Sequence, residues 1–190
     1  MAFSIRDAFD WAVTECRRTD VAYSQTYRNQ QTVNGITYYD CSSFIFFALW
    51  LGGGLDVGAL GFPTNLSAYH NGSANAWVVT SMVYTYLPQV QGFEQFDASA
   101  VSWQEGDILA KTNVPRSDRH TEMCYAPPTQ TMGAHNPSRG VSINDFQTGT
   151  NYYNILIRWT GGGPGPVPPG PTLPMPVWMM KRGQQIQRGF

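Results

Sequence analysis

The chain has 190 residues and a mass of 21.1 kDa, which suits one domain, or one domain followed by a tail. Hydrophobic residues make up 42% of it, enough for a buried core, and a formal net charge of -1 argues against general nucleic-acid binding. No apolar run approaches the roughly 18 residues of a membrane span, and residues 1–13 lack the order of a secretory signal peptide, so we expect neither membrane insertion nor signal-directed export.

The first predicted element is a helix that begins after Ser4. This serine is a good N-cap, and Asp7 stands three residues on, in a variant of the capping box. An apolar stripe at helical spacing follows, made of Ile5, Ala8, Phe9, Ala12, Val13 and Cys16. Cys16 is therefore expected to be a core residue, because a buried thiol behaves as a small hydrophobe.

A second helix is predicted over residues 41–51, with Asp40 as its N-cap and glycines 52–54 at its end. Its interior is apolar nearly all round, which predicts a buried helix. Cys41 occupies the first turn, where unpaired backbone N–H groups and the helix dipole favour negative charge. Since the thiolate is the nucleophilic form of cysteine, this position suits a reactive thiol. The alternative is another core cysteine.

Beyond this helix the signals change to turns and then to strands. Residues 56–75 are rich in turn formers and contain His70, expected to be structural on a surface loop, whereas 78–87 fits helix or strand. Strand patterns then dominate, at 107–110, 121–125, 131–135 and 152–159. Helices first and strands later predict an α+β fold with a largely antiparallel sheet.

The end of the chain has a different composition. Residues 161–176 are rich in glycine and proline and predict a linker, flexible at the glycines and polyproline-like beyond them. Residues 177–190 form a tail with an apolar patch at Trp178, Met179 and Met180. The tail is either disordered or a peptide that docks on the body or on a partner. The predicted folded body is residues 1–160.

Three cysteines without a C-x-x-C pair argue against a disulfide framework and a cysteine-rich zinc site, and leave a histidine-assisted cysteine open. If residues 120–125 and 130–135 form a hairpin, paired residue numbers sum to 255, and His120 lies directly opposite His135. One imidazole would then act as base toward Cys41 while the other orients it. A metal site of these three residues is less favoured, because no carboxylate is placed to support the ligands.

Four motifs, in this order, resemble those of the NlpC/P60 cysteine peptidase clan. Residues 39–44 (YDCSSF) look like its D-C-S nucleophile motif, and 106–109 (GDIL) like its G-D-hydrophobic strand. Residues 119–123 (RHTEM) match the strand that carries the base, and 132–136 (MGAHN) the strand that carries the third polar residue. Within the clan, the chain is most similar to phage peptidoglycan amidases of the Pal type. These also share a G-x-S-I/V-N-D segment, here residues 140–145.

The resemblance implies a papain-like NlpC/P60 catalytic domain over residues 1–160, with the nucleophile at a helix start packed on an antiparallel sheet. It also implies the catalytic roles. Cys41 would be the nucleophile, His120 the general base and His135 the residue that orients the imidazole.

The resemblance and the flanking sequence give four further candidates near the oxyanion or the substrate: Tyr23, Asp40, Ser42 and Glu122. Tyr23 is the best match to a tyrosine that the family places near the oxyanion, and Tyr27 is the alternative. Glu122 occupies a position that is often small in the family. Strand alternation places it on the His120 face, where its carboxylate would narrow the groove or attract a substrate amine. Cys124 shares this face but lies mid-strand, and we expect it to be structural.

Together these features predict a phage-type peptidoglycan hydrolase, an endolysin or virion-associated lysin, that cleaves an amide through a cysteine thioester. The Pal-type likeness favours the N-acetylmuramoyl-L-alanine amide, whereas the wider clan favours the γ-D-glutamyl amide of the stem peptide. A non-catalytic phage structural or wall-binding module is the competing class. No cofactor or metal is expected. The expected partner is bacterial peptidoglycan, with the tail as a contact to a phage protein. The enzyme would reach the wall from the host cytoplasm after release, or be carried in the virion.

Overall fold

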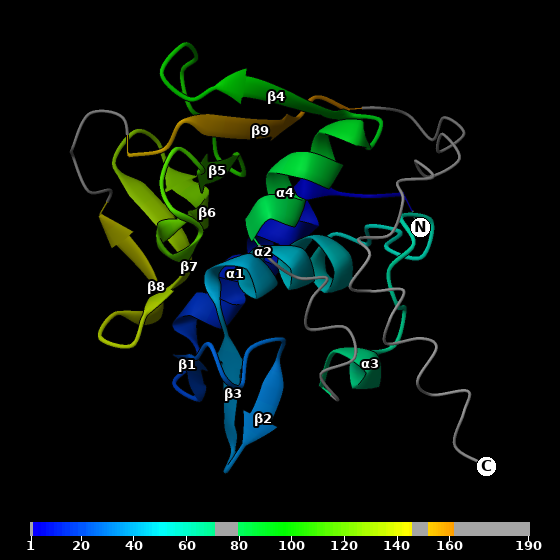
Figure 1. The fold of residues 1–190 in the computed structure, drawn as a ribbon, viewed down its shortest axis with the longest axis vertical. Helices are drawn as coiled ribbons and strands as arrows, with labels where there is room; N and C mark the ends of the chain where they lie inside the picture. Colours follow the sequence, from blue (N-terminus) through cyan, green and yellow to red (C-terminus); the bar gives the residue numbers. More distant parts are fainter. Residues whose placement is uncertain (1, 71–79, 146–151, 162–190) are drawn as a thin grey trace.

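The computed structural model describes residues 2–70, 80–145 and 152–161 (Figure 1). Within these ranges, helices pack against a six-stranded antiparallel sheet, and a three-stranded sheet lies below them in this view. The predicted α+β class is therefore confirmed. The predicted linker beyond Gly161 and the tail at 177–190 lie outside the described residues.

Helix α1 (Ile5–Arg17) begins where the sequence predicts. The Asp7 N–H donates to Ser4 Oγ at 3.1 Å, which satisfies one of the free N–H groups of the first turn. No helix in the described ranges is both long and apolar enough to cross a membrane.

The buried face of α1 follows the predicted stripe, and Glu15 is buried in addition. Ala8, Phe9 and Ala12 belong to the core, and Ile5 and Val13 pack against it. Cys16 is only half-buried, packed at the edge of the core. Glu15 can be buried because Arg18 donates to both of its carboxylate oxygens, at 2.9 and 3.0 Å, and the Tyr39 hydroxyl donates at 2.8 Å.

Helix α2 (Cys41–Phe47) continues into a π-helical segment, η1 (Ala48–Gly52), so the helical region ends close to the predicted residue 51. Helix α1 crosses this segment closely. A Cβ at Gly52 would lie 2.5 Å from Trp11 Cβ, and a Cβ at Gly53 would lie 2.8 Å from the Ser4 carbonyl oxygen. The glycines predicted as helix terminators therefore also allow the two helices to touch.

The remaining helical segments are short: α3 (Leu66–His70), α4 (Thr80–Tyr86), η2 (Leu87–Gln89) and η3 (Arg116–Asp118). The segment that fits helix or strand is helical from Thr80 to Gln89, whereas residues 71–79 lie outside the described ranges. His70 is exposed, as expected, but it ends a short helix instead of lying in a loop.

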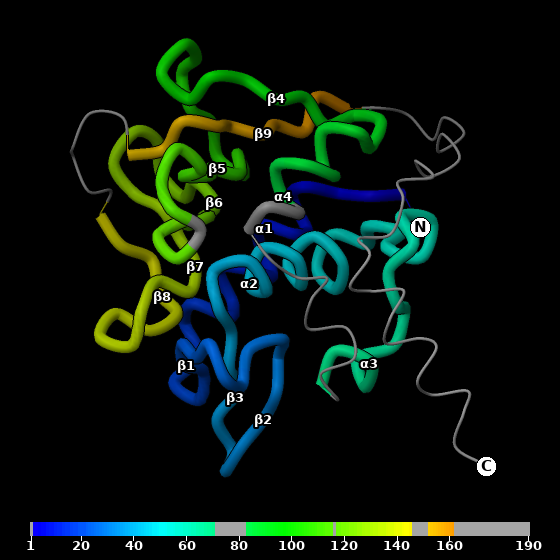
Figure 2. The backbone as a smooth tube through the Cα atoms, viewed as in Figure 1, coloured from blue at the N-terminus to red at the C-terminus, as the bar shows by residue number. Residues whose placement is uncertain are grey.

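In the described ranges, the large sheet has the strand order β4-β9-β5-β6-β7-β8, and every neighbouring pair is antiparallel. The strands are β4 (Phe93–Asp97), β5 (Ile108–Lys111), β6 (His120–Ala126), β7 (Gln130–Asn136), β8 (Gly140–Asp145) and β9 (Ile155–Trp159). The predicted strands correspond to β5, β6, β7 and β9, whereas β4 was not predicted and β8 was noted only as a motif. Strand β9 comes last in the sequence but lies between β4 and β5 (Figure 2).

The hairpin of β6 and β7 has the predicted register. Met123 pairs with Met132 and Cys124 with Thr131, before a bulge pairs Ala126 with Gln130. The two methionines belong to the main core, into which α1 and α2 also pack. Because neighbouring residues of a strand alternate in face, Glu122 and Thr131 lie on the opposite side of the sheet.

The three-stranded sheet was not predicted. Strand β3 (Ile36–Tyr39) pairs with β1 (Val21–Tyr23) in parallel and with β2 (Gln31–Val33) antiparallel. Asn34 and Gly35 join β2 to β3 with φ angles of 53° and 80°, as in the two-residue turns of β-hairpins. The register places Tyr23 opposite Tyr39, directly before the start of α2.

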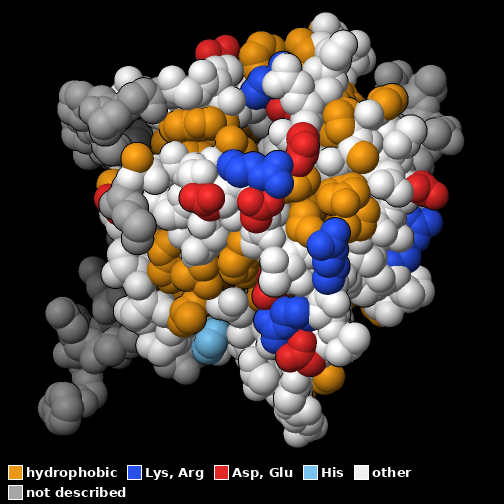
Figure 3. Space-filling model, turned by 180° about the vertical axis from the view of Figure 1, so that it is seen from behind, with side chains coloured by type: hydrophobic (Ala, Val, Ile, Leu, Met, Phe, Trp, Pro, Cys, Tyr) orange, Lys and Arg blue, Asp and Glu red, His pale blue; other side chains and the backbone are white. Residues whose placement is uncertain are grey.

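A second, smaller core lies on the other side of the large sheet: Ala98, Leu109, Cys124, Tyr153 and Leu156. Cys124 is fully buried there, and burial raises the pKa of its thiol to about 12, in agreement with a structural role. The rear surface carries acidic and basic side chains among apolar patches (Figure 3). This face shows no field of one sign, consistent with the near-zero net charge.

Candidate active site

Cys41 is the first residue of α2 and is held there by a complete capping box. The Asp40 carboxylate accepts from the Ser43 N–H at 2.7 Å, and Ser43 Oγ accepts from the Asp40 N–H at 2.9 Å. Asp40 is buried, and its other carboxylate oxygen accepts from Arg28 at 3.0 Å. These contacts fix the helix start and therefore the position of the thiol.

His120, the first residue of β6, hydrogen-bonds to the Cys41 side chain. Its Nε2 contacts Glu122 Oε1 at 2.6 Å, which leaves Nδ1 as the nitrogen that faces the thiol. Burial by itself lowers the pKa of this imidazole, but the hydrogen bonds and negative charges of Cys41 and Glu122 outweigh burial and raise it to about 10. His120 is therefore held as an imidazolium at neutral pH.

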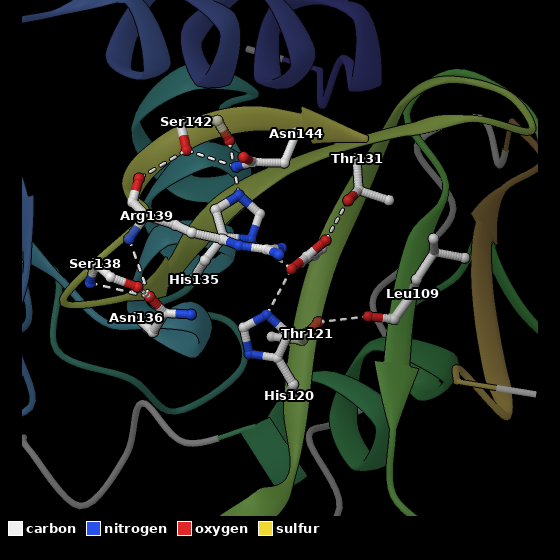
Figure 4. A network of polar contacts seen from close by, with 11 residues as sticks. Leu109, His120, Thr121, Thr131, His135, Asn136, Ser138, Arg139, Ser142 and Asn144 are labelled. Atoms are coloured by element: carbon white, nitrogen blue, oxygen red, sulfur yellow. Dashed lines mark hydrogen bonds and ion pairs between the residues drawn. The ribbon is translucent and has the colours of Figure 1, made fainter. Parts of the chain in front are cut away.

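Glu122 lies between the two imidazoles. His135 Nδ1 contacts the same carboxylate oxygen as His120, at 2.6 Å, and the ring centroids are 6.2 Å apart (Figure 4). The predicted side-by-side placement of the histidines is confirmed. However, among the contacts described they meet through Glu122, so His135 acts on His120 only indirectly. Burial disfavours the charged carboxylate, yet the two imidazoles reverse this effect and lower the pKa of Glu122 well below its usual range.

The carboxylate is also fixed from its other side. The Thr131 hydroxyl donates to Glu122 Oε2, and Tyr153 hydrogen-bonds to the same carboxylate. Gly133 lies across the hairpin, where an added Cβ would be 3.3 Å from Glu122 Cγ. Glu122 is thus a bridge inside the site. Its predicted roles, narrowing the groove or attracting a substrate amine, stay predictions, and Glu122 does line the pocket.

Strand β8 supports the outer histidine. His135 Nε2 donates to the Ser142 carbonyl at 2.9 Å, and Asn144 donates to Ser142 Oγ at 2.6 Å (Figure 4). The side chains of His120, Glu122 and His135 are only 13%, 7% and 5% exposed. The network therefore joins β6, β7 and β8 into one rigid group.

These side chains open into a largely polar pocket lined by Tyr23, Gln25, Cys41, Ser117, Asp118, Arg119, His120, Glu122, Thr131, His135, Asn136, Arg139, Asn144, Asp145, Tyr152 and Tyr153. Of the two candidate tyrosines, Tyr23 lines it, whereas Tyr27 does not and is 43% exposed. Burial raises the pKa of Tyr23, and the negative charges of Cys41 and Asp40 add to this effect, so its hydroxyl stays protonated. Asp40 and Ser42 do not line the pocket; both are buried, and the Ser42 hydroxyl donates to Asp40.

Several pocket residues were missed by the sequence analysis. Thr131 lies diagonally across the hairpin from Glu122, so the predicted register already contained the signal for it. Arg119 directly precedes His120, but strand alternation does not mark it as part of the site. Tyr152 and Tyr153 follow residues 146–151, which the structure leaves undescribed, and no local pattern connects them to the hairpin.

Within the described ranges, His120, Glu122 and His135 form a group that could hold a metal ion, with one ligand atom each within 4.8 Å of the others. Contrary to the sequence-based expectation, a carboxylate does stand beside the two histidines, since Glu122 lies between them. The nitrogen–oxygen distances of 2.6 Å are nevertheless those of hydrogen bonds. Two ligands of one tetrahedral Zn²⁺, each about 2.0–2.2 Å from the metal, would be roughly 3.4 Å apart.

Comparison with family models identifies a family to which most of the chain matches. A family model, Amidase_5, described as Bacteriophage peptidoglycan hydrolase, matches residues 4–152. The matched region contains the helix start with Cys41 and the hairpin with both histidines, and it ends before β9. Neither a search of curated proteins nor a search of solved structures gave a match.

Proposed function

Since the chain belongs to the bacteriophage peptidoglycan hydrolase family, we propose that it cleaves an amide bond of peptidoglycan with Cys41 as the nucleophile. One observation carries this proposal: a thiol at a capped helix start hydrogen-bonds to an imidazole whose other nitrogen contacts a buried carboxylate. This is the nucleophile–base–orienter arrangement of covalent catalysis. The orienter in contact with the base is Glu122, and His135 supports Glu122.

The proposed reaction begins with the Cys41 thiolate and the His120 imidazolium. The helix N-terminus and His120 place positive charge beside the sulfur atom that carries out the attack. The thiolate attacks the amide carbonyl, and backbone N–H groups at the start of α2, with the Tyr23 hydroxyl, stabilise the oxyanion. His120 donates its proton to the leaving amine, which gives a thioester, and the now neutral imidazole activates the water that hydrolyses it.

We infer that the scissile bond is the amide between the lactyl group of muramic acid and L-alanine. The Pal-type resemblance supports this choice, because it includes the G-x-S-I-N-D segment that forms β8 and contacts His135. A γ-D-glutamyl endopeptidase with the same machinery is the second candidate. For the fold, the helix-start thiol packed beside an antiparallel sheet supports a papain-like NlpC/P60 domain.

The decisive experiment is digestion of purified peptidoglycan followed by mass spectrometry. Amidase action releases intact stem peptides that begin with L-alanine, whereas endopeptidase action leaves an L-alanyl–D-glutamate stub on muramic acid. Cys41→Ser and Cys41→Ala should both abolish release, and alkylation of the wild-type thiol should do the same. Full activity of Cys41→Ser would contradict the mechanism. Cys124→Ala is a matched control that changes a thiol outside the pocket.

The same assay tests the competing classes. A non-catalytic wall-binding module would sediment with the peptidoglycan but release nothing from it. A metal-dependent hydrolase would lose activity in EDTA and regain it with Zn²⁺. We expect release to be unchanged by EDTA.

A further inference from the structure

Arg119 lines the pocket directly beside His120, and its guanidinium is held in place by Tyr84 from helix α4. Arg119 Nη1 donates to the Tyr84 hydroxyl at 2.8 Å, and the guanidinium carbon lies 6.0 Å from the centre of the tyrosine ring. The side chain is half-buried. Tyr84, which is not among the residues that line the pocket, therefore holds the positively charged Arg119 side chain at the edge of the site.

Arg119 differs from three other half-buried arginines, which each form an ion pair with a carboxylate. Arg18, Arg28 and Arg158 each pair with a buried carboxylate at 2.7–3.0 Å. In the part of the chain that the structure describes, Arg119 has no carboxylate within ion-pair distance, and its Nε is buried without a hydrogen-bond partner. The neighbouring Asp118 instead accepts from the Ser117 hydroxyl at 2.9 Å.

A guanidinium that lines a pocket is best satisfied by a planar anion such as a carboxylate, and among the described residues none supplies one to Arg119. In the stem peptide, D-glutamate is joined through its γ-carboxyl group, so its α-carboxylate stays free. This group lies within one residue of both candidate scissile amides. We propose that Arg119 binds the free α-carboxylate of the D-glutamyl residue and makes the enzyme selective for it over the carboxamide form. This inference rests on the proposed function.

The test uses two soluble muramoyl stem peptides that differ at one group, the α-carboxylate or the α-carboxamide of the D-glutamyl residue. Wild-type kcat/KM should favour the carboxylate by roughly tenfold to a hundredfold, the range expected for a charged hydrogen bond. In Arg119→Gln the ratio should fall close to one, through loss of rate on the carboxylate peptide. The rate on the carboxamide peptide reports whether this variant is folded and catalytically competent.

Two further variants make the test specific. Tyr84→Phe removes only the hydroxyl that positions the guanidinium, and should reduce the preference severalfold by raising KM for the carboxylate peptide. Arg139→Gln changes another pocket arginine and should keep the preference. Equal wild-type rates on the two peptides, or a preference lost in Arg139→Gln and kept in Arg119→Gln, would overturn the inference. Cleavage of neither peptide, with cell walls also left intact, would reject the proposed function itself.

Discussion

Glu122 contacts the His120 imidazole directly, and its charge helps to raise the pKa of that imidazole. Glu122→Gln preserves size and can still accept from His120 Nε2, but it removes the charge. We expect kcat to fall by roughly 10²–10⁴-fold. The wild-type pH–rate profile should decline on the alkaline side near the His120 pKa of about 10. In the variant this decline should move to lower pH, since the protonated imidazole loses its stabilising partner. An unmoved alkaline limb would contradict the assigned role.

Gly133 packs directly against Glu122 across the hairpin. A methyl group there would lie 3.3 Å from Glu122 Cγ, and Glu122 cannot move aside without losing its contacts to His120, His135 and Thr131. Gly133→Ala should therefore lower kcat at least about tenfold, because a displaced carboxylate misaligns the base. The melting temperature should change little. Full activity in this variant would mean that the carboxylate has more freedom than these contacts indicate.

At the scale of elements, the cap of α2 fixes the helix start and with it the position of Cys41. Asp40→Ala removes both the capping carboxylate and the ion pair with Arg28, so the free energy of unfolding should fall by about 2–4 kcal/mol. Activity should fall as well, since Cys41 starts this helix. Ser4→Ala at the cap of α1 is the control. It should cost about 1 kcal/mol and leave kcat unchanged. Urea unfolding and peptide hydrolysis measure the two effects, and equal activity losses in both variants would contradict the argument.

The elements that sequence predicts well are those with local signals. Each cap side chain lies within four residues of the backbone N–H group that it satisfies. The alternation of residues along each strand indicates which of them face each other in the hairpin. The three-stranded sheet was missed because strands of three or four residues are too short for alternation to be read. Its one strong signal was Asn34-Gly35, the residue pair that two-residue hairpin turns prefer.

In the candidate site, too, short sequence patterns predict some residues, whereas others depend on contacts between segments that are distant in the sequence. Cys41, His120 and His135 could be placed from a helix cap and a register. The bridging position of Glu122 could not, because it depends on side-chain rotamers and on Tyr153, which joins the hairpin from a distant segment. The burial of Glu15 was likewise unpredictable, since its partner Tyr39 comes from β3.

At the scale of the whole molecule, the large sheet predicts where the chain can be shortened. A chain that ends after Gly161 keeps all six strands, and should keep both its melting temperature and its hydrolysis of soluble stem peptides. A chain that ends after Asn154 loses β9, which separates β4 from β5, and should not fold cooperatively. Thermal unfolding and peptide hydrolysis distinguish the two truncations. A large loss of stability in the longer one would show that residues beyond Gly161 pack on the domain.

The central place of β9 also has a consequence for synthesis on the ribosome. Strand β4 begins at Phe93, but its partner is complete only at Trp159. At about 5–20 residues per second, the nascent chain therefore waits roughly 3–13 seconds with the facing edges of β4 and β5 unpaired. Open strand edges are templates for pairing with other chains. We expect translational pausing between these two strands to lower the yield of soluble enzyme, whereas a pause after β9 has emerged should not.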